Sequence, residues 1–109
     1  MGQLERDLEK KCNMLAEAGG WQHAKLEKGA RGWPDRIYFG PFGALLVVEF
    51  KLPGEKPRKQ QAAVHRRLDA LWHPVSVVTS FEQFSSLLRD ASALAGALAG
   101  QPPAPAQSN

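Results

Sequence analysis

The chain has 109 residues, of which 43% are hydrophobic and 23% charged, a composition typical of one globular domain. No apolar run approaches the roughly 18 residues that a membrane span needs. The start of the chain, MGQLERDLEKK, lacks the apolar core of a secretory signal. We therefore expect no membrane role and a cytoplasmic location. The single cysteine, Cys12, excludes an internal disulfide and a zinc site built from several thiolates.

Positive charge is concentrated in the middle of the chain. Residues 25 to 67 carry ten Lys and Arg against four Asp and Glu, whereas the whole chain has a net charge of only +3. Such a block fits a polyanionic partner such as nucleic acid. A solvated basic face without a ligand has the same composition, so charge alone does not decide the function.

The spacing of apolar residues and turn signals predicts a mixed α/β domain (α+β type) over residues 1–100. The expected elements, in chain order, are a helix at 4–18, strands at 21–26, 35–39 and 44–51, a helix from Pro57, a strand at 75–78 and a helix from 81 to 98. The turn at 40–43 joins the second and third strands into a hairpin. Residues 101–109 contain three prolines and no large apolar residue, and we expect a disordered tail.

Two acidic side chains are expected to face each other across this hairpin. Side chains alternate faces along a strand, so Glu49 and Lys51 share one face of the third strand. If Phe39 pairs with Leu45, Asp35 stands opposite Glu49. Facing carboxylates destabilise a sheet unless a positive group lies between them. A magnesium or manganese ion would serve, because Mg²⁺ is commonly held by one or two carboxylates plus a substrate phosphate. Lys51 would then position a water or stabilise charge on the phosphate.

The residues around this pair resemble a known nuclease family. The matching segments are Gly32-Trp33-Pro34-Asp35, Val48-Glu49-Phe50-Lys51, Gly54 and Gln61. They resemble the PD-(D/E)xK motif in the form used by virus-type replication-repair nuclease (VRR-NUC) domains. The resemblance implies an αβββαβ core, here with an extra C-terminal helix, that hydrolyses DNA phosphodiesters with a divalent metal. It also implies that Asp35, Glu49 and the Phe50 carbonyl are metal ligands and that Lys51 is the catalytic lysine.

The family also places an acid on its first helix and a catalytic glutamine on the helix after the motif. Gln61 fits the glutamine, because it shares a helical line with Val64 and Leu68 that faces the sheet. For the acid, Glu5 and Glu9 are both open, and we favour Glu9 as a metal ligand because its distance to the glycine pair after the helix resembles the family spacing better. The segment at 71–74, LWHP, departs from the small turn residue usual in the family.

Basic and aromatic residues near the motif are candidates for contacts with DNA. Lys25, Arg31 and Arg58 are expected to bind substrate phosphates, and Trp33 is the best placed of the tryptophans to stack on a base. Solvated loop bases and a packed tryptophan are the alternative interpretation. His65 lies four residues after Gln61, which would place it at the border of the site, but we favour a partly buried structural histidine.

The leading functional hypothesis is a structure-selective, magnesium-dependent endonuclease that acts on branched or four-way-junction DNA. The junction substrate is what the family resemblance implies, as is a bacterial or phage-infected host cell. The last helix has more Ala, Leu and Phe than so small a domain can cover, which predicts a homodimer. The alternatives are a non-catalytic DNA-binding module, which the presence of all three motif residues disfavours, and a purely structural protein, which leaves the acidic pair unexplained.

Overall fold

The computed structural model describes residues 2–27 and 31–100, and its elements follow the expected order. They are α1 (Gln3–Ala18), β1 (Gln22–Lys25), β2 (Arg36–Phe39), a 3-10 turn η1 (Pro41–Gly43), β3 (Leu45–Phe50), α2 (Lys59–Ala70), β4 (Val75–Val78) and α3 (Phe81–Ala99). This is the predicted αβββαβ core with a further helix. The tail predicted at 101–109 lies outside the described residues.

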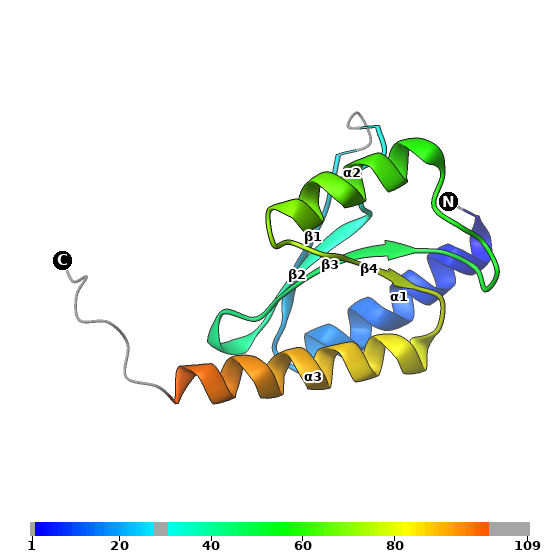
Figure 1. The fold of residues 1–109 in the computed structure, drawn as a ribbon. Helices are drawn as coiled ribbons and strands as arrows, with labels where there is room; N and C mark the ends of the chain where they lie inside the picture. The colour runs from blue at the N-terminus through cyan, green and yellow to red at the C-terminus, as the bar shows by residue number, and fades with distance from the viewer. Residues whose placement is uncertain (1, 28–30, 101–109) are drawn as a thin grey trace.

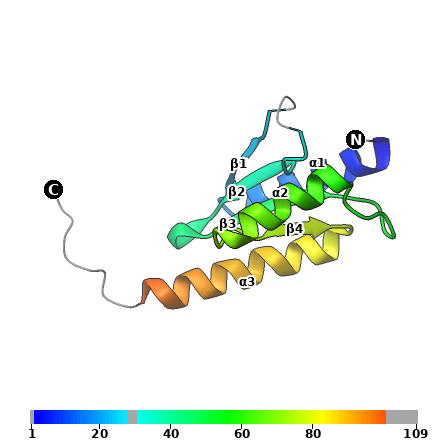
Figure 2. The ribbon, with the colours of Figure 1, turned by 45° about the horizontal axis from the view of Figure 1, so that its top comes forward.

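The strands form one mixed sheet in the order β1-β2-β3-β4. The pairs β1–β2 and β2–β3 are antiparallel, whereas β3 and β4 run parallel because α2 connects them. Figures 1 and 2 show α2 alone on one face of the sheet, with α1 and α3 on the opposite face. Each strand therefore presents alternate side chains to α2 and to the pair of helices.

The main apolar core lies between the sheet and the pair α1 and α3. Buried there are Cys12, Tyr38, Val48, Phe50 and Phe84, each at most 1% exposed. Phe84 contacts the rings of both Tyr38 and Phe50. Val48 and Phe50 of β3 point into this core, so Glu49 between them must point to the α2 side.

The hairpin register is the one that the sequence predicts. Phe39 pairs with Leu45 and Arg36 with Val48, and the backbone N–H of Asp35 donates to the Val48 carbonyl at 2.9 Å. The ladder thus brings Asp35 beside Glu49 at the open end of the hairpin.

Two local details differ from the sequence predictions. The second helix begins at Lys59 and not at Pro57, because Arg58 has an extended backbone and its N–H donates to the Gln61 side chain at 2.8 Å. At the other end of α2, Trp72 has a φ of 69°, the left-handed conformation that glycine adopts most easily. The unusual LWHP segment therefore keeps the turn that a small residue would make, with backbone strain at Trp72.

Among the described residues, no helix has both the length and the apolar character needed to cross a lipid bilayer.

Candidate active site

Glu49 lies at the centre of a polar cluster on the α2 face of the sheet. Its side chain is 2% exposed, and Gln61 Nε2 donates to its Oε2 at 2.9 Å. Lys51 Nζ lies 3.8 Å from the same oxygen. The alternation of β3 and the first turn of α2 thus bring the three predicted side chains together.

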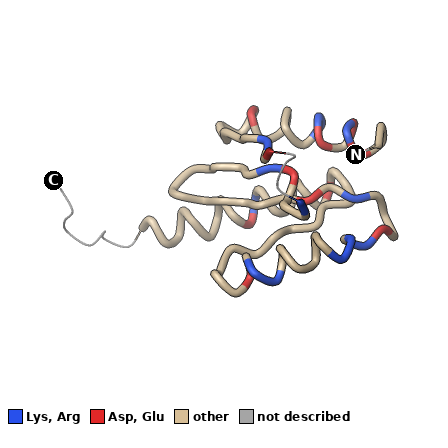
Figure 3. The backbone as a smooth tube through the Cα atoms, turned by 90° about the horizontal axis from the view of Figure 1, so that it is seen from above, with Lys and Arg blue, Asp and Glu red and all other residues tan. Residues whose placement is uncertain are grey.

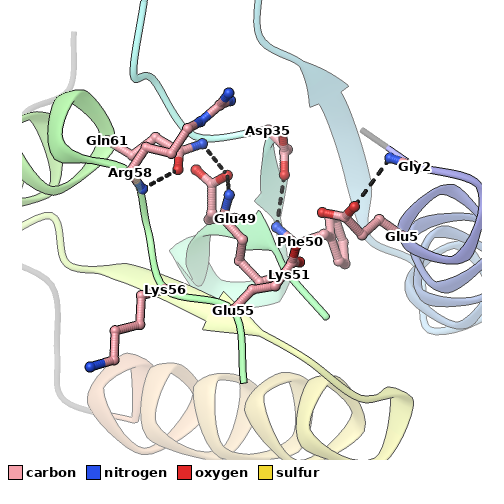
Figure 4. A pocket seen from close by; sticks show the side chains of 10 residues that line it. All are labelled: Gly2, Glu5, Asp35, Glu49, Phe50, Lys51, Glu55, Lys56, Arg58 and Gln61. Atoms are coloured by element: carbon pink, nitrogen blue, oxygen red, sulfur yellow. Dashed lines mark hydrogen bonds and ion pairs between the residues drawn. The ribbon is translucent and has the colours of Figure 1, made fainter. Parts of the chain in front are cut away.

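Asp35 reaches the same cluster from the loop before β2. Its Oδ2 accepts a hydrogen bond from the backbone N–H of Phe50 at 2.7 Å, so the carboxylate is fixed against β3 (Figure 4). Pro34 precedes Asp35 and restricts the backbone of Trp33 to an extended conformation, which directs the loop into the hairpin.

Both carboxyl groups have raised pKa values. Burial, and then the neighbouring Asp35 carboxylate, raise the pKa of Glu49 from 4.5 to about 7. Burial also raises the pKa of Asp35, and the Phe50 N–H opposes the shift by stabilising its charged form. Two carboxyl groups that resist ionisation beside each other mark a place where a cation would be favourable.

These side chains line a cavity of about 380 Å³, called here the acidic cavity (Figure 4). Its lining residues are Gly2, Glu5, Asp35, Glu49, Phe50, Lys51, Glu55, Lys56, Arg58 and Gln61. Four catalytic candidates named from the sequence are among them. Phe50 is also in the lining, as expected for a residue whose backbone carbonyl is a candidate ligand.

A second cavity of about 470 Å³, called here the basic cavity, adjoins the first. Asp35, Arg58 and Gln61 line both cavities. The other lining residues of the basic cavity are Arg6, Lys25, Leu26, Glu27, Arg31, Gly32, Trp33, Pro34 and Gln60. All three bases that the sequence nominates for phosphate binding therefore gather next to the acidic pair. Figure 3 shows further Lys and Arg along α2 and the segment leading to it, whereas the distal half of α3 carries no charge.

Gly32 holds the motif loop against α2. Its φ is +79°, and a Cβ built at this position would stand 2.5 Å from the Gln60 carbonyl oxygen. Any side chain here would both strain the backbone and collide with the helix. This close packing fixes Trp33, which is 44% exposed, and Arg31 at the rim of the basic cavity.

The helix acids occupy different surroundings. Glu5 lines the acidic cavity, where its Oε1 accepts a hydrogen bond from the Gly2 backbone N–H at 3.1 Å. Glu9, the acid favoured from the sequence, is buried and paired with Arg36 Nε, and it is not in the cavity lining. The spacing argument did not consider Arg36, which lies on the α1 face of β2 and forms an ion pair with the Glu9 carboxylate.

The sequence analysis did not predict a contact between His65 and Glu49. His65 was expected to be structural, but its Nε2 lies 3.6 Å from Glu49 Oε1. The signal was its position one helical turn after Gln61, which puts both side chains on the same side of α2.

The side chains fit a magnesium ion. Within residues 2–27 and 31–100 no group of three or more His, Cys, Asp and Glu is arranged as a metal cage, but Mg²⁺ needs only one or two carboxylates and otherwise keeps waters or substrate oxygens. Glu49 Oε1 is buried without a hydrogen-bond partner. An oxygen in that state, beside a second carboxylate with a raised pKa, is a suitable hard ligand.

Comparison with known proteins finds a relative in sequence and a similar solved structure. No protein-family model matches the chain. "Putative nuclease p44" of Acyrthosiphon pisum secondary endosymbiont phage 1 is 44% identical over 74 residues, which cover 68% of this chain and 78% of that protein. A solved structure described as a VRR_NUC domain superposes with a TM-score of 0.71 and 32% identity, covering 78% of this chain and 94% of the other. With the fold and the motif residues in the expected places, the chain belongs to the VRR-NUC family of nuclease domains.

Proposed function

We propose that this protein is a metal-dependent DNA endonuclease that hydrolyses phosphodiester bonds at the acidic cavity. The observation that carries the proposal is the convergence of Asp35, Glu49, Lys51 and Gln61 on one cavity that continues into a basic one. A passive DNA-binding module would have no reason to bury two carboxylates next to its phosphate-binding surface, because their charge repels DNA.

Asp35, Glu49 and the Phe50 carbonyl would hold a magnesium or manganese ion. Such an ion supplies a water of lowered pKa and stabilises negative charge on the phosphate. The side chains of the protein would orient the ligands and the substrate. Gln61 and Lys51 orient the Glu49 carboxylate, and the Lys51 ammonium lies close enough to contact a phosphate oxygen that approaches Glu49.

The basic cavity supports a path for the substrate strand. Lys25, Arg31 and Arg58 would neutralise phosphates on either side of the scissile bond. The exposed indole of Trp33 offers a surface on which an unpaired base could stack. A platform of this kind favours DNA with distorted or unpaired nucleotides, and it supports selectivity for branched or four-way-junction substrates.

Dimer formation is part of the same proposal. Leu94 and Leu98 on α3 are each 63% exposed, and Phe42 of η1, which lies against Gly96, is 69% exposed. A symmetric pair of subunits would bring two sites to one branched substrate.

The decisive assay compares cleavage of linear, flapped and four-way DNA with magnesium, manganese or excess EDTA. We expect cutting only with a divalent metal, and faster cutting of the branched substrates. Cleavage that continues undiminished in EDTA would refute the metal-dependent mechanism. Equal rates on all three DNAs would leave a nuclease without structure selectivity.

A separate prediction concerns the two helix acids. We propose that Glu5, and not Glu9, is the helix acid that acts with Asp35 and Glu49, because Glu5 lines the acidic cavity and Glu9 does not. Glu5→Gln should lower the cleavage rate several-fold and leave the melting temperature unchanged. Glu9→Gln weakens the pair with Arg36 and should cost roughly 1–3 kcal/mol of stability, with near-normal cleavage by the folded fraction. Cleavage rates and thermal melts of both variants distinguish the roles, and a larger loss of cleavage in Glu9→Gln would restore the assignment made from the sequence.

A further inference from the structure

The buried carboxylate of Glu49 has one oxygen that is held and one that is not. Gln61 Nε2 donates to Oε2 at 2.9 Å, and Lys51 Nζ lies nearest the same oxygen. Oε1 has no hydrogen-bond partner, although it is buried. A carboxylate fixed at one oxygen can still change the direction in which the other points.

A ring nitrogen of His65 lies close to this unpartnered oxygen. His65 Nε2 lies 3.6 Å from Glu49 Oε1, and this nitrogen is also buried without a hydrogen-bond partner. Two buried polar atoms of complementary kinds that face each other are costly apart and favourable once joined. The separation exceeds a hydrogen bond by about half an ångström, which a small rotation of either side chain closes.

His65 approaches the Glu49 carboxylate from the same helix, α2, as Gln61 does. Gln61 and His65 are four residues apart, so they lie one above the other on the helix face that covers β3. Gln61 is fixed in turn, because its Oε1 accepts the Arg58 backbone N–H at 2.8 Å. The helix thus presents two donors to the two oxygens of one carboxylate.

We propose that His65 is a positioning residue that donates from Nε2 to Glu49 Oε1 and fixes the orientation of this carboxylate for the metal. The inference rests on the proposed function, since it assigns His65 a role through Glu49. His65 has no direct role in the chemistry. Donors that orient a ligating carboxylate typically change metal affinity by about 10- to 100-fold when they are removed.

The test measures metal binding as well as cleavage. His65→Leu fills a similar space without a donor, and His65→Gln returns a donor at about the position of Nε2. His73→Leu is the matched control, because His73 is exposed after the end of α2. For each variant, the dissociation constant of manganese is measured by isothermal titration calorimetry, and kcat and KM are measured on a branched DNA.

We expect His65→Leu to weaken manganese binding by about tenfold or more and to lower kcat with KM for DNA little changed. His65→Gln should recover most of both losses, and His73→Leu should match the wild type. If His65→Leu binds manganese within twofold of the wild-type affinity, the inference is wrong. Cleavage by the wild-type protein in that case would still support the proposed function. Loss of binding in both His65 variants would also overturn the inference, because a packing defect is not rescued by a donor. A wild-type protein that neither binds manganese nor cuts DNA would refute the proposed function and this inference together.

Discussion

Asp35→Asn and Glu49→Gln should each slow DNA cleavage by two orders of magnitude or so, the scale seen when one preorganised polar group is lost from an active site. The fold should survive, because an amide oxygen can still accept the hydrogen bonds from Phe50 N–H and from Gln61. Circular dichroism and single-turnover cleavage measure the two effects. Glu82→Gln is the matched control, since Glu82 is an exposed acid on α3. A folded Glu49→Gln protein that cuts at near wild-type rate would show that the site is misassigned.

Without metal, Asp35→Asn should bind DNA more tightly than the wild type, although it cuts DNA more slowly. Two unit charges about 4 Å apart interact by roughly 4 kcal/mol at an effective dielectric of about 20, so the acidic pair repels a docking phosphate. Asp35→Asn removes one of these charges and should tighten metal-free binding to a four-way junction, measured by fluorescence anisotropy at fixed ionic strength and at about pH 8, above the pKa of about 7 of Glu49. Calcium should tighten binding of the wild type more than that of the variant. If calcium weakens both equally, the ion only screens phosphates and the passive binding module is correct.

The metal-free protein should lose stability as the pH rises from about 5 to about 8. Burial and the Asp35 carboxylate raise the pKa of Glu49 from 4.5 to about 7. Between those values the folded state binds more protons than the unfolded chain, so stabilisation present below the lower value is lost as the pH passes the upper one. The shift corresponds to roughly 3 kcal/mol. The raised pKa of Asp35 acts in the same direction.

Urea unfolding in EDTA at a series of pH values measures this effect. His65 has a lowered pKa because of burial and Lys51, and it destabilises the folded state at the acidic end, so the wild-type curve alone mixes both contributions. The difference between wild type and Glu49→Gln isolates the carboxyl group. Glu49→Gln should have wild-type stability near pH 4.5 and exceed it at about pH 8. Curves that stay parallel across this range would mean that Glu49 ionises freely in the folded protein.

Much of the fold and site could be predicted because each step depended on local rules. Alternation along β3 separates Glu49 from Phe50, and the connection at 40–44 sets a register that brings Asp35 beside Glu49. Helical periodicity selects Gln61 over its neighbour Gln60. The family motif then assigned chemistry to these positions, and the structural and sequence comparisons support the family assignment.

The surroundings of the two helix acids depend on contacts between distant elements, which the sequence pattern does not contain. Glu5 and Glu9 both lie on the inner side of α1, and periodicity alone treats them alike. The crossing of α1 over the sheet gives them different neighbours, because it brings Glu9 to Arg36 of β2 and leaves Glu5 at the cavity.

By itself, then, the sequence determined the elements, the hairpin register and the pairing of Asp35 with Glu49, since these follow from the period of two in strands and 3.6 in helices. Only the tertiary structure decided which helix acid faces the cavity, how closely His65 approaches Glu49 and how Gly32 packs against Gln60. Those contacts depend on the depth and angle at which α1 and α2 cross the sheet, and packing of the whole core sets both.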